Sequence, residues 1–344
     1  MNLKELSSLL GLSQTTVSRA LNGYPEVSEA TRKKVTAMAR AHGYAPNARA
    51  RGLATGRTMS IGHVIPLSTR HEIVNPVFSD FVAGASEIYS ANGYDMLLTV
   101  VPDQGEAEAY RKITARQTVD GVIVHGPKAQ DGRIALLREI GMPFVVHGRM
   151  SADDTGYAWV DMNNVTAFSC AADCLIDLGH RRIGLLNGLE TLDFALRRRE
   201  GVQRALAAAG IEAQARYFLS DEMTEGFGYR ATCALLDLDE PPTALIVSSL
   251  IIGIGVRRAA EERGLKLGRE LSLIVHDDDL SYLRNGSETG APVFTATQSS
   301  VRDAGRMCAQ NLLDIIAAPD TAARFQTELE AKLVMGSSTG PCPV

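Results

Sequence analysis

From Met59 onward, short β-rich runs alternate with amphipathic helical runs, and this alternation constrains the fold more than any other feature. The expected strands are Ser60–Pro66, Tyr94–Thr99, Gly121–His125, Phe144–His147, Arg182–Asn187, Thr243–Ser248, Leu271–His276 and Phe294–Thr297. The expected helices are Phe78–Asn92, Glu106–Gln117, Val165–Leu178, Arg199–Ala209, Gly226–Leu236, Ile252–Arg263 and Val301–Ile316. Apolar strands that alternate with helices predict parallel sheets covered on both faces. Because one sheet would not comfortably hold so many strands, we expect two Rossmann-like α/β lobes.

The first 58 residues differ from the rest of the chain in charge. They hold nine Lys and Arg residues against three acidic residues, a net charge of +6, whereas the whole chain carries −5. The remainder therefore carries −11. A basic head on an acidic body is typical of a DNA-binding module joined to another unit. The length of 344 residues also favours two or three domains over one compact core.

Capping residues in the head predict three short helices. Asn2 and Glu5 have the spacing of a capping box at the start of the first helix. Its apolar stripe consists of Leu3, Leu6, Leu9 and Leu10. Gly11 can take the left-handed conformation of the following turn, while Ser13 and Ser28 can cap the second and third helices.

The second of these helices, residues 14–22, has one side that is suited to DNA. Its apolar side holds Val17, Ala20 and Leu21, and its opposite side holds Thr15, Arg19 and Asn22. Short hydroxyls, an amide and a guanidinium form hydrogen bonds with phosphates and base edges. The pattern predicts the recognition helix of a helix-turn-helix, and the alternative is a generic three-helix bundle.

Three runs in the head carry a resemblance to a known family. Leu12–Asn22, Val27–Arg32 and Gly43–Asn47 resemble the lac/purine repressor family, and the similarity continues along the whole chain. The resemblance implies a small all-α helix-turn-helix head and a hinge helix, joined to an α/β two-lobed periplasmic-binding-protein-like domain. It also implies that Pro46 opens the hinge helix and that Leu53 inserts between bases in the minor groove. The alternative for this segment is a basic linker.

The resemblance and the polar face of the second helix together define the expected DNA-binding residues. These are Ser13, Gln14, Thr15, Thr16, Ser18, Arg19, Asn22, Asn47, Ala50, Arg51 and Leu53. We expect Arg19, Thr15 and Gln14 to contact bases, and Ser13, Thr16 and Asn22 to contact phosphates.

Motifs for catalysis, cofactors and metals are missing from the sequence. It has no G-x-G-x-x-G after the first expected strand, no P-loop, no H-E-x-x-H and no G-x-S-x-G. The seven histidines and five cysteines lack the spacing of metal ligands. Residues 277–279 form an acidic run directly after a strand, where hydrogen bonding to a polyol fits better than metal binding. We therefore expect no cofactor, no metal site and no catalytic residue.

The resemblance also implies a small-molecule effector between the two lobes. The expected effector-binding residues are Asn75, Phe78, His147, Asp161, Phe194, Arg198, Met223, Ser249, Asp277 and Gln298. Two positions depart from the family pattern: Ser249-Leu250 replaces Asn-Asp, and His147-Gly148-Arg149 replaces Asp-Arg. The second departure resembles regulators of α-glucoside use and favours a disaccharide.

We expect a helix-turn-helix domain at 1–44, a hinge at 45–58 and an effector-binding and dimerisation domain at 59–344. Within the last, the N-lobe would hold about 59–160 plus 297–320, and the C-lobe about 161–296 plus 321–340. The predicted function is a homodimeric transcriptional repressor that is controlled by an effector and binds a pseudo-palindromic operator. Because neither a signal peptide nor a membrane span is visible, we expect a cytoplasmic protein. The alternatives are a carbohydrate-binding protein or a carbohydrate-acting α/β enzyme without a DNA role.

Overall fold

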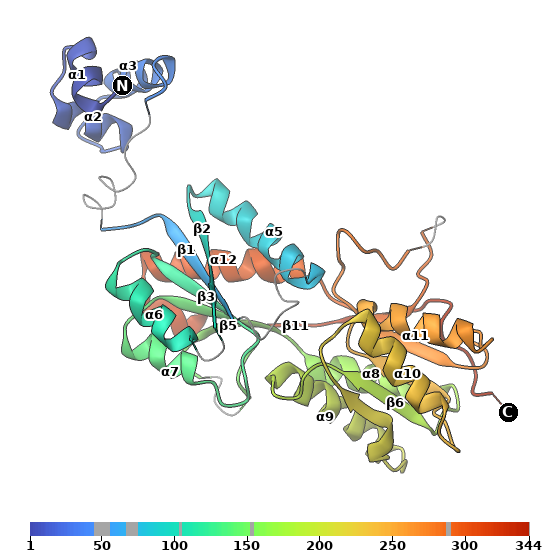
Figure 1. Cartoon of the computed structure of the whole chain (residues 1–344). Coiled ribbons are helices and arrows are strands. Elements are labelled where there is room, and N and C mark those ends of the chain that lie inside the picture. Colours follow the sequence, from blue (N-terminus) through green and yellow to red (C-terminus); the bar gives the residue numbers. More distant parts are fainter. Residues whose placement is uncertain (45–55, 67–74, 103–104, 152–154, 287–289, 344) are drawn as a thin grey trace.

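The computed structural model describes residues 1–44, 56–66, 75–102, 105–151, 155–286 and 290–343. Figure 1 shows a small helical head at the N-terminal end and a larger body made of two α/β lobes. None of the helices in these ranges is both long and apolar enough to cross a membrane.

The head consists of three helices that pack on one small core. They are α1 (Leu3–Leu10), α2 (Gln14–Leu21) and α3 (Glu29–Ala41). The core includes Leu6, Leu10, Val17, Ala20, Val27, Val35 and Ala39. Leu9, expected on the apolar stripe of α1, is 56% exposed, so the stripe is narrower than predicted.

The predicted caps of the head helices are all present. Asn2 and Glu5 form both hydrogen bonds of the capping box, and the side chains of Ser13 and Ser28 accept from backbone N–H groups of α2 and α3. Gly11 ends α1 with a φ of 63°, which is the left-handed conformation expected for that turn.

The first lobe is built on a parallel sheet with strand order β11-β5-β4-β3-β1-β2. Its elements are β1 (Ser60–Pro66), α5 (Pro76–Ala91), β2 (Asp95–Val101), α6 (Glu106–Ala115), β3 (Gly121–His125), α7 (Gly132–Glu139), β4 (Phe144–His147), β5 (Ala158–Met162), α12 (Val301–Ala317), η2 (Pro319–Arg324) and β11 (Gln326–Leu329). In Figure 1, α5 and α12 lie on one face of this sheet, and α6 and α7 lie on the other.

The second lobe is built on a sheet with strand order β12-β10-β9-β8-β6-β7, in which only β12 runs antiparallel to its neighbour. Its elements are α8 (Asn164–Asp177), β6 (Ile183–Asn187), α9 (Asp193–Ala208), η1 (Ala215–Tyr217), β7 (Phe218–Ser220), α10 (Glu225–Leu236), β8 (Ala244–Val247), α11 (Leu250–Glu262), β9 (Ser272–Asp277), β10 (Thr295–Gln298) and β12 (Lys332–Val334).

The two lobes are as predicted, but several elements were not foreseen. All expected strands are present, whereas β5, β7, β11, β12 and α7 were missed. β7 and β12 have three residues each, and β11 carries alternating polar residues at a sheet edge, so their periodicity is too weak to detect. Helix α9 begins six residues before the expected Arg199, because Leu192 at its N-cap position makes no side-chain capping hydrogen bond that would mark its start in sequence.

The chain crosses between the lobes after β5, after β10 and after β11. This corrects the expected division of the lobes in three ways. Asp161 and Met162, assigned to the C-lobe, are the last residues of β5 in the first sheet. Strand β11, within the range 321–340 assigned to the C-lobe, pairs with β5 in the first sheet. The last residues of β10, assigned from 297 to the N-lobe, pair with β9 in the second sheet. The crossovers bring the carboxyl ends of strands from both lobes to one region, where ligands bind in such sheets.

Candidate functional site

The exposed residues of α2 agree with a recognition helix. Gln14, Thr15 and Arg19 are exposed, whereas Val17 and Ala20 are buried in the core of the head. A guanidinium, an amide and a hydroxyl are therefore available together on one surface for contacts with base edges.

Other expected DNA-binding residues already have partners within the helix. The Ser13 hydroxyl accepts from the Thr16 N–H at 3.0 Å and lies 2.8 Å from the Thr16 hydroxyl. The Asn22 amide donates to the Ser18 hydroxyl at 3.4 Å, and Asn22 Oδ1 is buried without a partner among the described residues. Asn22 therefore lies less fully on the exposed side than its spacing suggested.

The remaining expected DNA-binding residues belong to the hinge. Asn47, Ala50, Arg51 and Leu53 lie outside the described residues, so the prediction of a hinge helix falls on residues that the structure does not describe.

A cavity of about 480 Å³ lies between the lobes and is lined by residues from both. Seven of the expected effector-binding residues line it, and they are Asn75, Phe78, His147, Asp161, Phe194, Arg198 and Met223. Its size and its mixture of aromatic and polar walls are typical of sites for small organic ligands.

Three expected residues do not line the cavity, and their chain neighbours do. Ser249 caps α11, where its hydroxyl accepts from the Ile252 N–H. Asp277 and Gln298 bond to each other at 3.2 Å. The cavity is lined instead by a chain neighbour of each, namely Ser248, Asp278 and Ser299. Successive side chains near a strand end face different directions, so an error of one residue in register exchanges a lining side chain for a packed one.

Histidines and phenylalanines form the wall from the first lobe. His125 and His147 end the neighbouring strands β3 and β4 in register, and both line the cavity. Phe81 packs against His147 with 4.4 Å between ring centroids, and Phe78 packs edge-on against His125 at 5.2 Å. This wall offers flat apolar faces beside imidazole nitrogens, which suits a ring that carries hydroxyl groups.

His63 supports this wall from behind. Its Nδ1 lies 3.0 Å from His125 Nε2, and its Nε2 lies 3.3 Å from the Tyr89 hydroxyl. Burial lowers the pKa of His63 and of His147 to about 4 each. Burial, together with the other two histidines, lowers the pKa of His125 well below its usual value. The three imidazoles are therefore neutral at pH 7.

A buried arginine dominates the wall from the second lobe. The Arg198 guanidinium lies between the rings of Phe168 and Phe194, 4.9 and 4.8 Å from their centroids. It donates to Asn164 Oδ1 at 2.8 Å and to the Ser248 carbonyl at 2.6 Å. Burial lowers the pKa of Arg198 to about 10, so the guanidinium remains charged at pH 7.

Asp278 supplies the negative charge on the same wall. Burial raises the pKa of its carboxyl, but His276 and Arg198 outweigh burial, and the pKa is lowered overall. A cation and an anion thus lie within one cavity beside aromatic side chains, where they can donate to and accept from hydroxyl groups.

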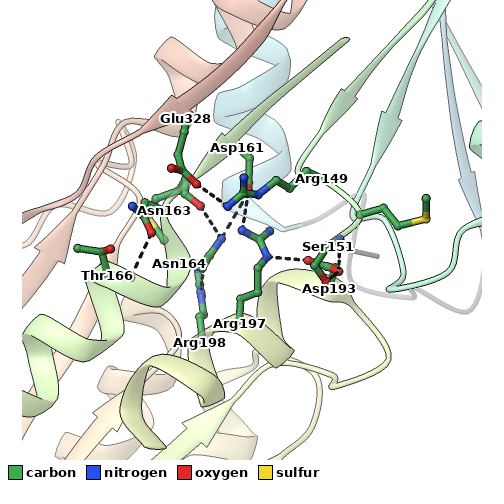
Figure 2. A network of polar contacts seen from close by, with 12 residues as sticks. Arg149, Ser151, Asp161, Asn163, Asn164, Thr166, Asp193, Arg197, Arg198 and Glu328 are labelled. Carbon is green, nitrogen blue, oxygen red and sulfur yellow. Dashed lines mark hydrogen bonds and ion pairs between the residues drawn. The ribbon is translucent and has the colours of Figure 1, made fainter. Parts of the chain in front are cut away.

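A network of ion pairs adjoins this cavity and connects the lobes (Figure 2). Arg197 on α9 contacts Asp161 of β5 and Asp193 of its own helix, each at 2.6 Å. Asp193 in turn accepts from the Ser151 backbone N–H at 2.8 Å and from the Ser151 hydroxyl at 2.5 Å. Arg149 contacts Asp161 at 3.3 Å. Burial raises the pKa of Asp161 despite the two arginines.

Sequence reasoning missed several residues of the cavity and its network. His63, His125, Arg197, Asp193 and Ser151 were not singled out. The histidines did carry a signal, because two expected strands each end in histidine and would lie side by side in a parallel sheet. The contacts of Arg197 with Asp161 and of Ser151 with Asp193 carried no signal, since each joins residues of different lobes. In the described ranges, no group of three or more His, Cys, Asp or Glu residues could hold a metal ion.

Both parts of the chain match known families. Residues 2–47 match the model of bacterial regulatory proteins of the lacI family, and residues 172–339 match a periplasmic binding protein-like domain. The HTH-type transcriptional regulator AglR of Rhizobium meliloti (strain 1021) is 41% identical over 344 residues, which cover 100% of this chain and 95% of AglR. RafR of Escherichia coli is 33% identical over 324 residues, which cover 93% of this chain and 94% of RafR.

Solved structures agree with these matches. A complex of the transcriptional regulator CelR with cellobiose has a TM-score of 0.71 at 27% identity, and the match covers 98% of this chain and 99% of CelR. The lac repressor dimer bound to operator and to the anti-inducer ONPF has a TM-score of 0.81 at 24% identity, which supports the fold, with 98% and 99% covered. The 41% identity to AglR over the whole chain, together with the two family matches, means that this protein belongs to the lacI family of bacterial transcriptional regulators.

Proposed function

We propose that the protein is a homodimeric repressor whose affinity for operator DNA is controlled by a neutral sugar, an α-glucoside disaccharide, bound between the lobes. The observation that carries this proposal is the composition of the interlobe cavity. The cavity walls hold the charged side chains of Arg198 and Asp278 together with neutral histidines and aromatic rings. A ligand with many hydroxyl groups and an apolar ring face satisfies such walls, because a hydroxyl group can accept from the guanidinium and donate to the carboxylate.

The size of the cavity and one relative support a disaccharide. A volume of about 480 Å³ is within the range for ligands larger than a single small ring. CelR, which covers nearly the whole chain, has been solved with cellobiose, a disaccharide. The run from His147 to Arg149, which resembles regulators of α-glucoside use, favours an α-glucoside.

DNA binding in this proposal uses two copies of α2 in successive major grooves. Arg19, Thr15 and Gln14 would contact bases, and the hinge with Asn47, Ala50, Arg51 and Leu53 would lie in the minor groove between them. One short helix contacts too few base pairs to select an operator in a genome, so two copies at a set spacing are required.

Dimerisation is supported by an apolar edge of the first lobe. Strand β2 ends the sheet, and four of its residues are 37–43% exposed, namely Met96, Leu97, Leu98 and Val100. A long, apolar and exposed edge strand favours association with another chain.

The test begins with selection of an operator from random duplexes by the purified protein. Fluorescence anisotropy then measures operator affinity across a salt series, with and without maltose, trehalose, sucrose or cellobiose. We expect binding that weakens steeply with salt, and one α-glucoside that changes the operator Kd. Arg199→Lys is a matched control for the cavity, because Arg199 pairs with Glu190 and does not line it. Absence of a preferred sequence would refute the DNA-binding proposal, and an operator Kd that no sugar changes would refute the effector proposal.

A further inference from the structure

The network that connects the lobes contains one buried donor without a partner. Nη2 of Arg197 has no hydrogen-bond partner among the residues that the structure describes, although the side chain is only 5% exposed. The other two nitrogens of this guanidinium each have a partner: Nε donates to Asp193, and Nη1 donates to Asp161. A buried donor without a partner is rare in folded proteins, since its desolvation is not compensated, and such a group often belongs to a binding site.

The position of Arg197 relates this donor to the effector. Arg197 lines the interlobe cavity and directly precedes Arg198, which lines the same cavity. The carboxylates around it hold the guanidinium in one orientation, as Figure 2 shows. A guanidinium has donors only, so the group that completes its hydrogen bonding must offer an acceptor oxygen.

The charges of the network indicate what kind of oxygen this is. Two arginines, Arg149 and Arg197, contact three carboxylates, those of Asp161, Asp193 and Glu328. The cluster thus has no excess positive charge to attract an anion. A hydroxyl oxygen of a neutral sugar matches it better than a carboxylate or phosphate.

We propose that Arg197 is a second effector-binding arginine, which donates from Nη2 to an oxygen of the bound sugar and so makes the bridge between the lobes part of the effector site. This inference rests on the proposed sugar-binding function of the cavity. Because Asp161 belongs to the first lobe and Asp193 to the second, a ligand on Arg197 contacts the group that joins the two. Ser151 extends the connection, since it is a first-lobe residue that donates twice to Asp193.

Substitution of Arg197 separates a direct contact from a supporting role. Arg197→Lys keeps the cation between the buried carboxylates, but a single ammonium nitrogen cannot reach Asp161, Asp193 and the ligand together. Arg199→Lys is the matched control, because Arg199 contacts Glu190 and the Phe218 ring and does not line the cavity. Ser151→Ala weakens the bridge and leaves every cavity side chain in place.

Calorimetric titration measures the affinity of each variant for the tightest-binding sugar among maltose, trehalose, sucrose and cellobiose, and for its monodeoxy analogues. For Arg197→Lys we expect affinity for the parent sugar to fall about 10- to 100-fold, the loss typical of one hydrogen bond to a charged group. One deoxy analogue should bind this variant as it binds the wild type, because the lost hydroxyl is the partner of Arg197. Ser151→Ala should weaken all analogues by one common factor, and Arg199→Lys should change none.

Two results would overturn the inference while leaving sugar binding intact. One is an Arg197→Lys protein that keeps the wild-type ratios across all analogues. The other is a crystal structure of the wild type with its sugar in which no sugar oxygen lies within hydrogen-bond distance of Arg197 Nη2. This structure also decides the question if the variant does not fold. Failure of the wild type to bind any of the sugars would instead refute the proposed function, and this inference with it.

Discussion

Because of its histidines, we predict that the first lobe has a lower free energy of unfolding in mild acid than at neutral pH. We also predict that His147→Gln makes this decrease smaller. His63 and His147 have pKa values of about 4 in the folded protein, because burial excludes the charged form. A histidine in the unfolded chain has a pKa near 6.5. Above pH 6.5 the imidazole is neutral in both states, so its full contribution to stability is present. As the pH falls toward 4, the imidazole binds a proton in the unfolded state but not in the folded state, so the free energy of unfolding decreases.

The size of this loss follows from the two pKa values. At pH 5.0, each of these histidines should reduce the free energy of unfolding by about 2 kcal/mol relative to pH 7.5. His63 and His147 together account for about 4 kcal/mol, and His125, whose pKa is also lowered, adds to this. His147→Gln should therefore lose about 2 kcal/mol less than the wild type between the two pH values.

The single tryptophan makes this measurement specific to the lobe concerned. Trp159 is buried on β5 of the first sheet, next to Val146 of the strand that His147 ends, so its fluorescence during urea unfolding reports on that lobe. Met223→Leu is the control, because it alters the cavity without removing a titratable group. Equal losses for the wild type and His147→Gln between pH 7.5 and 5.0 would mean that folded His147 titrates normally, and the neutral imidazole wall would be wrong.

Three further predictions concern DNA recognition and helix packing. Arg19→Ala should cost about 1–3 kcal/mol of operator binding and relax the preference at one base pair, measured by anisotropy on substituted operators; an equal loss on all sequences would indicate a phosphate contact. Leu53→Ala should reduce operator bending, seen by energy transfer between duplex ends, with dimerisation unchanged; unaltered bending would contradict insertion between bases. Gly201→Ala should destabilise the second lobe by about 1–3 kcal/mol in thermal unfolding, because the new Cβ would lie 2.3 Å from the Val165 carbonyl oxygen of α8. An unchanged melting temperature would show that α8 and α9 separate at no cost.

Local features of the chain were predictable because neighbouring residues encode them. Ser13 and Ser28 cap α2 and α3 by bonds to N–H groups three residues ahead, so their role is visible in a short window of sequence. The strand periodicity from Ser60 onward likewise arises from adjacent residues, and it correctly predicted two α/β lobes. Short or polar strands such as β7 and β11 were not predicted for the same reason, since their few residues show little alternation of apolar and polar side chains.

Sequence patterns predicted the helix-turn-helix head and the alternation of strands and helices, and the family resemblance added seven of the residues that line the cavity. Tertiary structure alone decided that Asp278 rather than Asp277 lines the cavity, because one residue of register reverses which side chain faces the ligand. It alone brought Arg197 to Asp161, 36 residues apart in the chain, across the junction of the lobes. Contacts of this kind depend on how whole sheets and helices pack, and short stretches of sequence do not encode that packing.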